Sequence, residues 1–271
     1  MPIRLHADDL GLHPAVDRAI FRAFEAGAVG GASILATGPT FHEAARQARS
    51  LGLPTSLHLA VVDTGPLSPP AEIPSLVGRD GRFPGRFGEV VRRALLVERP
   101  GGLRQRELHR EVGRQLQAFA DAGLIGRGGL LVDGHQHLHL LPPVFAALLQ
   151  RGEGFGLAAF RLPRRSPAER RQFGRRSLGF AVAEILGRRA ARAAARQGIF
   201  AVPCWGVLYA GHLTVERATS VLDSLPPRAD GQLICHPGDD DRALGALHPW
   251  RYAWETELAT VLALAGAGAG A

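Results

Sequence analysis

Three histidines at a spacing of two residues follow a short apolar run in the middle of the chain. The run is Leu130-Leu131-Val132, and residues 133–139 read Asp-Gly-His-Gln-His-Leu-His. If a strand continues through them, His135, His137 and His139 lie on one side, because alternate residues of a strand share a face. Imidazole is a ligand of Zn²⁺, Fe, Cu and Ni. The segment therefore predicts a metal-dependent enzyme.

Two adjacent carboxylates, Asp8 and Asp9, follow another apolar start, Ile3-Arg4-Leu5. In an extended strand they point to opposite faces, so they serve one site only if the chain turns between them. One interpretation has one carboxylate on a metal and the other acting as a base. The alternative is that an aspartate caps the following helix, whose start Pro14 suits.

Two further histidines lie at or near the ends of predicted strands. His58 is surrounded by apolar residues, where a lone histidine is more often a hydrogen-bonded core residue than a ligand. His236 closes the strand 232–235 and precedes Pro237 and Gly238, where a general acid or base reaches substrate. The alternative for His236 is an ordinary turn residue.

Short apolar runs alternate with helical patterns along the chain, which predicts a parallel α/β sheet. The predicted strands are residues 3–9, 30–36, 55–62, the histidine strand that starts with the apolar run 130–132, 158–163 and 232–235. The predicted helices are residues 14–26, 41–50, 107–122, 143–150 and 214–224, with a last helix running through Leu264. Residues 64–88 are rich in Pro and Gly, and this composition predicts a long loop. Long loops in compact domains are often functional.

The composition is typical of a globular protein. A chain of 271 residues without a recognisable linker is expected to form a single domain over residues 1–271. The net charge of +7 invites a nucleic-acid or membrane interpretation, yet all 32 basic residues are Arg, as GC-rich coding produces. Two isolated cysteines, no visible signal peptide and no long apolar run predict a cytoplasmic protein.

An Arg-rich helical stretch at about residues 164–197 is predicted as an insertion in this domain. Phe180, Val182, Ile185 and Leu186 give it an amphipathic character. We interpret it as a solvated helix face. The alternative is a basic helix lying on an anionic membrane, at the inner face.

Four motifs, in order and over nearly the whole chain, resemble the YdjC/ChbG family of carbohydrate deacetylases. They are Ala7-Asp8-Asp9-Leu10-Gly11, Ser56-Leu57-His58, the 133–139 segment and Cys235-His236-Pro237. Leu10, Ser56 and Gln136 depart from the family's usual Phe, Gly and His. The Pro-rich segment 69–84 and the Arg-rich stretch are similar to the hopanoid-biosynthesis branch.

This resemblance implies a fold, a metal site and roles for individual residues. The fold is a distorted (β/α) barrel related to the polysaccharide deacetylases, with one divalent metal, Mg²⁺ or Zn²⁺. The implied metal ligands are Asp9, His58 and His135. The implied catalytic residues are Asp8 as general base, His236 as the acid for the leaving amine, and Arg161, which positions the base. His137 and His139 are expected to face substrate.

The implied reaction is hydrolysis of the N-acetyl group of an N-acetylglucosamine unit, with a hopanoid lipid as the expected carrier and peripheral membrane contact as its consequence. A soluble chito-oligosaccharide deacetylase is the alternative within the enzyme class. A basic nucleic-acid-binding protein with structural histidines is the distant alternative. Aromatic residues make up only 6% of the chain, which disfavours base stacking, and we expect no nucleic-acid partner.

Overall fold

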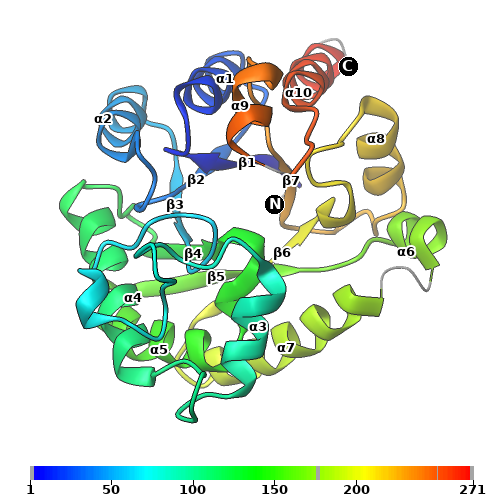
Figure 1. Ribbon diagram of the computed structural model, residues 1–271. Helices are drawn as coiled ribbons and strands as arrows, with labels where there is room; N and C mark the ends of the chain where they lie inside the picture. The colour runs from blue at the N-terminus through cyan, green and yellow to red at the C-terminus, as the bar shows by residue number, and fades with distance from the viewer. Residues whose placement is uncertain (1–2, 175–177, 249, 269–271) are drawn as a thin grey trace.

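Seven parallel strands form a closed barrel in chain order, with the last strand beside the first (Figure 1). The structure is a computed structural model and describes residues 3–174, 178–248 and 250–268. The strands are β1 (Arg4–Leu10), β2 (Gly31–Ile34), β3 (Thr55–Leu59), β4 (Leu130–Gly134), β5 (Leu157–Pro163), β6 (Phe200–Trp205) and β7 (Gln232–Cys235). The predicted (β/α) barrel is thereby confirmed.

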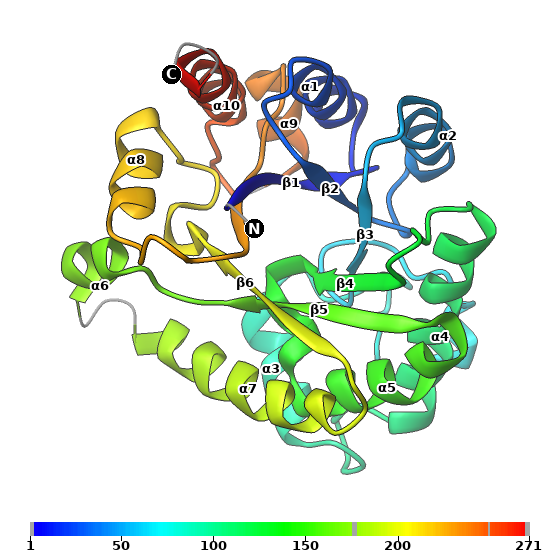
Figure 2. The same cartoon turned by 180° about the vertical axis from the view of Figure 1, so that it is seen from behind.

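Helices surround the barrel because each parallel crossover needs a connecting segment on the outside (Figure 2). They are α1 (Pro14–Glu25), α2 (Phe41–Leu51), α3 (Phe87–Leu95), α4 (Gln105–Asp121), α5 (Pro142–Gly152), α6 (Pro167–Phe173), α7 (Leu178–Ala195), α8 (Val215–Asp223), α9 (Asp241–Leu247) and α10 (Trp254–Gly268). Short 3-10 turns are η1 (Pro70–Glu72), η2 (His135–Leu140), η3 (Glu153–Phe155) and η5 (Val207–Tyr209). Among the described helices, none has the length and apolarity needed to cross a bilayer.

One strand and two α-helices escaped the sequence prediction, and each has a local reason. β6 carries Pro203, which cannot donate a ladder hydrogen bond, so residues 200–205 do not look like a central strand. α3 begins inside a segment rich in Gly and Pro. α9 is only seven residues long and begins in an acidic turn, where Asp240 accepts from the backbone N–H of Ala243.

The long segment between β3 and α4 lies on the viewer's side of the barrel in Figure 1 and behind it in Figure 2. Two buried carboxylates of α4 hold this segment in place. Glu111 accepts from the backbone N–H groups of Leu67 and Ser68 at 3.0 and 2.8 Å, and Glu107 accepts from Ser75 at 2.7 Å. Residues 64–88 form the predicted loop, apart from η1 and the start of α3.

The Arg-rich stretch contains α6 and α7 and connects β5 to β6. Residues 175–177 of this stretch lie outside the described residues. Glu184 of α7 pairs with Arg165 at 2.7 Å and with Arg170 at 3.0 Å, which ties the two helices together. The stretch is therefore helical, as its periodicity predicts.

Candidate active site

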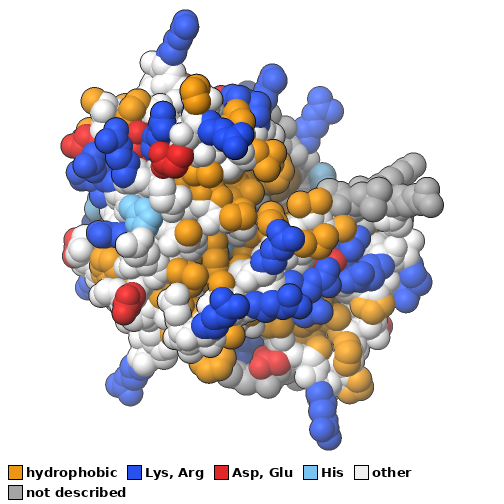
Figure 3. Space-filling view, turned by 90° about the horizontal axis from the view of Figure 1, so that it is seen from below, with side chains coloured by type: hydrophobic (Ala, Val, Ile, Leu, Met, Phe, Trp, Pro, Cys, Tyr) orange, Lys and Arg blue, Asp and Glu red, His pale blue; other side chains and the backbone are white. Residues whose placement is uncertain are grey.

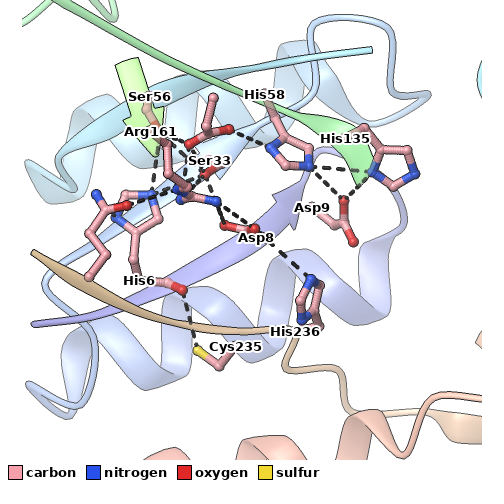
Figure 4. Close-up of polar contacts among 12 residues, drawn as sticks. His6, Asp8, Asp9, Ser33, Ser56, His58, His135, Arg161, Cys235 and His236 are labelled. Atoms are coloured by element: carbon pink, nitrogen blue, oxygen red, sulfur yellow. Dashed lines mark hydrogen bonds and ion pairs between the residues drawn. The ribbon is translucent and has the colours of Figure 1, made fainter. Parts of the chain in front are cut away.

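Polar side chains, rather than apolar ones, meet inside the barrel around the buried guanidinium of Arg161 (Figure 4). Arg161 donates to both carboxylate oxygens of Asp8 at 2.8 and 2.7 Å. Its other terminal nitrogen lies 2.9 Å from Asp133 and 2.9 Å from the hydroxyl of Ser33. Burying a charge is costly unless it is paired and hydrogen-bonded, and this network supplies both conditions.

Asp8 and Asp9 serve the same region because the chain turns between them. The pairing of β1 with β2 shifts between Ala7 and Leu10, and Asp9 has a φ of 72°. This left-handed conformation costs free energy for a residue other than glycine, although Asp tolerates it better than most. Neither aspartate caps α1, because His13 accepts from the N–H of Ala15 at that position.

Asp9, His58 and His135 bring three donor atoms to one point. Asp9 Oδ1 lies 3.3 Å from His58 Nε2 and 3.1 Å from His135 Nδ1, and the two nitrogens are 3.3 Å apart. A tetrahedral Zn²⁺ with its usual bond lengths spaces ligand atoms by about 3.3 Å. An octahedral Mg²⁺ spaces adjacent ligands by about 3.0 Å. The triangle fits a divalent cation of either kind.

The far nitrogen of each imidazole faces a second carboxylate. His58 Nδ1 lies 2.5 Å from Asp133, and His135 Nε2 lies 3.7 Å from Asp63. Gln136 donates a hydrogen bond to Asp63 and so holds that carboxylate. A carboxylate behind a metal-binding histidine fixes the ring and raises its basicity, which is the usual surrounding of a metal site.

The charges of this cluster stabilise one another. Burial alone would raise the pKa of Asp9, but the interaction with His135 and hydrogen bonds from both histidines hold that pKa well below its usual range. Burial opposes protonation of His58, yet Asp133 and Asp9 outweigh it and raise the pKa of His58 to about 10. The site is thus built to hold positive charge beside Asp9.

His236 faces Asp8 at ion-pair distance, with its Nε2 3.9 Å from Asp8 Oδ2. Behind it, Glu257 of α10 accepts a hydrogen bond from the backbone N–H of His236 and lies 3.8 Å from its Nδ1. Glu257 also accepts from the N–H of Leu213 at 2.8 Å and is fully buried. Glu257 therefore holds the backbone of His236, and its carboxylate faces ring atom Nδ1 at a distance longer than a hydrogen bond.

The three histidines of residues 135–139 do not share one face, because the strand ends at Gly134. Residues 135–140 form a kinked 3-10 turn in which Gln136 and His137 have φ values of 52° and 56°. The expectation that the three imidazoles line one strand face is wrong. His135 turns to Asp9, whereas the ring centroid of His137 lies 6.4 Å from that of Phe180 of α7.

His139 is fully buried, and its Nε2 donates to the carbonyl oxygen of Arg161 at 2.9 Å. This burial argues against direct contact of His139 with substrate. Burial also lowers the pKa of His137 to about 3 and that of His139 to about 4, so both rings are neutral at neutral pH. Of the two, only His137 lines the cavity of the site.

The cavity has a volume of about 390 Å³ and opens at the carboxyl ends of the strands, where active sites of parallel barrels lie. Asp8, Asp9, His58, His135 and His236 all line it. Trp250 and Tyr252 form an aromatic wall, with their ring centroids 5.5 Å apart, and Trp250 also lies 5.1 Å from the ring of His135.

With this geometry in place, comparison with known proteins identifies the family. Residues 2–265 match the YdjC-like protein family. The chain belongs to that family. A structure named for cellobiose-phosphate cleavage, from Enterococcus faecalis, has the same fold, with a TM-score of 0.69 over 96% of this chain and 90% of that one, at 20% identity.

Relatives of this YdjC-like chain include proteins named carbohydrate deacetylase. The one from Homo sapiens is 35% identical over 60% of this chain and 49% of its own length. The one from Geobacillus stearothermophilus is 33% identical over 56% of each chain. A chitooligosaccharide deacetylase from Serratia marcescens is 31% identical, also over 56% of each. The chain spans about half the length of these relatives.

Several residues of this YdjC-like site were not assigned from the sequence. Ser56 stands two residues before His58 on β3 and therefore on the same face, a signal that was available. Ser56 donates to Asp133 at 2.8 Å. Glu257 and Trp250 gave no such signal, because only the fold brings them to the histidines.

Proposed function

We propose that this chain is a metal-dependent hydrolase that removes the N-acetyl group from an N-acetylglucosamine unit. The observation that carries the proposal is the triangle of Asp9, His58 and His135 in one cavity with Asp8 and His236. A bound divalent cation would polarise the acetamide carbonyl and lower the pKa of a water molecule. Relatives named carbohydrate deacetylase support the same chemistry.

The residues of the chain divide the proton transfers between them. Asp8 accepts the proton of the attacking water, because Arg161 keeps this carboxylate ionised and in place. Burial alone would raise the pKa of Asp8, and Arg161 outweighs it, so the pKa is lowered. His236, whose Nε2 lies 3.9 Å from Asp8, gives a proton to the departing amine. Trp250 and Tyr252 pack against the sugar ring.

The substrate we propose is an N-acetylglucosamine unit carried by a hopanoid lipid, with the chain in peripheral contact with the membrane. The resemblance of segment 69–84 to the hopanoid-biosynthesis branch supports it. A soluble chito-oligosaccharide is the second candidate, and the relative named chitooligosaccharide deacetylase favours it. The cation is Mg²⁺ or Zn²⁺, both of which the triangle fits.

The test is acetate release by purified protein reconstituted with each cation. N-acetylglucosaminyl hopanoid is compared with N,N'-diacetylchitobiose, and the metal content is measured on the same samples. Release from the hopanoid alone supports the full proposal. Preference for the disaccharide supports the deacetylation reaction and overturns the assignment of a hopanoid-linked substrate. Stoichiometric metal without release from either substrate overturns the deacetylase proposal.

A further inference from the structure

An apolar groove lies beside the catalytic cavity, between α3 and α7. Its volume is about 420 Å³, slightly more than that of the cavity itself. Figure 3 shows hydrophobic side chains gathered on this side of the molecule, next to arginines. The apolar walls include Phe87, Val91, Leu140, Phe180, Val182 and Leu186.

The groove and the cavity are continuous, because they share part of their lining. Gln136, His137 and Val207 line both. The left-handed kink at Gln136 and His137 places these two residues at the junction. A molecule with its acetamido group at Asp9 therefore reaches the groove by passing His137.

The chemistry of the groove is that of a hydrocarbon site. Among the described residues that line it, none carries a charged side chain, and its polar groups are Gln136 and His137 at the junction. Phe87 and Val182 leave 50% and 56% of their surface exposed, although the removal of apolar surface from water is favourable. Contiguous exposed apolar surface commonly marks a binding site.

The charged side chains of α7 do not line the groove. Arg188, Arg189 and Arg192 are exposed and do not line the groove. They therefore leave the groove free to take an apolar group. A free sugar has no hydrocarbon group that could fill the apolar groove. An amino sugar with a hydrocarbon aglycone has such a group, and the sugar ring holds it at a fixed distance from the acetamide.

We propose that the groove between α3 and α7 binds the apolar aglycone of an amphiphilic amino sugar whose acetamido group lies at Asp9, His58 and His135. This inference rests on the proposed function for the placement of the acetamide. The lining residues define the groove independently of the proposed function.

The experiment uses methyl, butyl and octyl N-acetyl-β-glucosaminides, each below its micelle concentration, with the metal-reconstituted protein. Acetate release gives kcat/KM, and calorimetry gives Kd for the same compounds. Each methylene that enters the groove improves Kd and kcat/KM by up to about fourfold. We expect octyl to exceed methyl by at least 100-fold in both quantities.

Phe87→Asp and Val182→Asp place a charge in the groove at exposed positions and should reduce the octyl-to-methyl ratio to below 10. Val215→Asp is the matched control, because Val215 is 43% exposed on α8 and does not line the groove. It should keep the wild-type ratio. Circular dichroism checks the fold of all three variants.

The results of this experiment can overturn the groove proposal and the deacetylase proposal independently of each other. A Kd that is independent of chain length, or a ratio that both groove variants leave unchanged, overturns the groove. A Kd that improves with chain length and is weakened by Val182→Asp, without acetate release from any compound, supports the groove and overturns the deacetylase proposal. Adding vesicles loaded with the octyl compound then shows whether the groove takes its ligand from a bilayer or from solution.

Discussion

Arg161 Nη1 contacts both carboxylate oxygens of Asp8 in the middle of the barrel, with N···O distances of 2.8 and 2.7 Å. The same guanidinium lies 2.9 Å from Asp133, which in turn faces His58. One cation therefore connects the proposed base to the carboxylate behind a proposed metal ligand. A planar guanidinium suits this role better than an ammonium group, because its donors are fixed in a fork.

Arg161→Leu should destabilise the protein by about 3–5 kcal/mol, because Asp8 and Asp133 would be left as buried carboxylates without their cation. Urea unfolding of the metal-free protein measures this. Arg192→Leu, at an exposed position of α7, is the control and should change stability by less than about 0.5 kcal/mol. Equal stability of the two variants would contradict the proposed network.

Asp8→Asn and Asp9→Asn should separate catalysis from metal binding, although the residues are adjacent. Asp8→Asn removes the proposed base and should lower kcat by about 10²–10⁴-fold while metal content stays stoichiometric. Asp9→Asn removes a ligand and should lose the metal and the activity together. Metal analysis after gel filtration, with acetate release on the same fractions, distinguishes them. A metal-free Asp8→Asn protein would show that the roles are wrongly divided.

Glu257→Gln should slow turnover by about 10- to 100-fold with little change in KM, because Glu257 positions His236 rather than contacts substrate. The loss should be greatest for substrates with poor leaving amines, which depend most on the proton from His236. Steady-state kinetics over a series of N-acetyl leaving groups measures this. A uniform loss across the series would indicate a purely structural role. Glu255→Gln, on the exposed side of α10, is the control.

Stability should fall as the pH is lowered from 6 to 5 in metal-free protein. Burial lowers the pKa of His6 to about 4, that of His137 to about 3 and that of His139 to about 4. A histidine whose pKa is lower in the folded protein than in the unfolded chain stabilises the fold at pH values above the unfolded pKa of about 6.5. This stabilisation is lost as the pH falls towards the pKa of the folded protein. The loss is about 2 kcal/mol for each ring at pH 5, relative to pH well above 6.5.

The contribution of His58 to stability depends on pH in the opposite direction, because folding raises the pKa of His58 to about 10. Its contribution is complete below pH 6.5 and does not change in this window. Urea midpoints at pH 6 and pH 5 for wild type and His6→Asn test the prediction. The variant should show a smaller difference between the two midpoints, and an equal difference would count against neutral, buried His6.

The sequence indicated the alternation of strands and helices well, because apolar runs and helical periodicity are local signals. It also placed Asp9, His58 and His135 in one candidate site through motif resemblance. Three features were out of its reach. The turn at Asp9 depends on a positive φ that composition does not reveal, and the end of β4 at Gly134 separates histidines whose spacing suggested a common face. Glu257 joins the site only through packing of α10.

The closure of the barrel has a consequence for how the protein acquires its chemistry. Residues 4–7 of β1 pair with residues 232–235 of β7, so the first and last strands must find each other across nearly the whole chain. Contacts of such long sequence separation form late, since the entropy of closing the loop has to be overcome first. During synthesis, Asp8 and Asp9 emerge from the ribosome long before His236 does. The nascent chain therefore remains without a complete set of catalytic groups until its last strand is made.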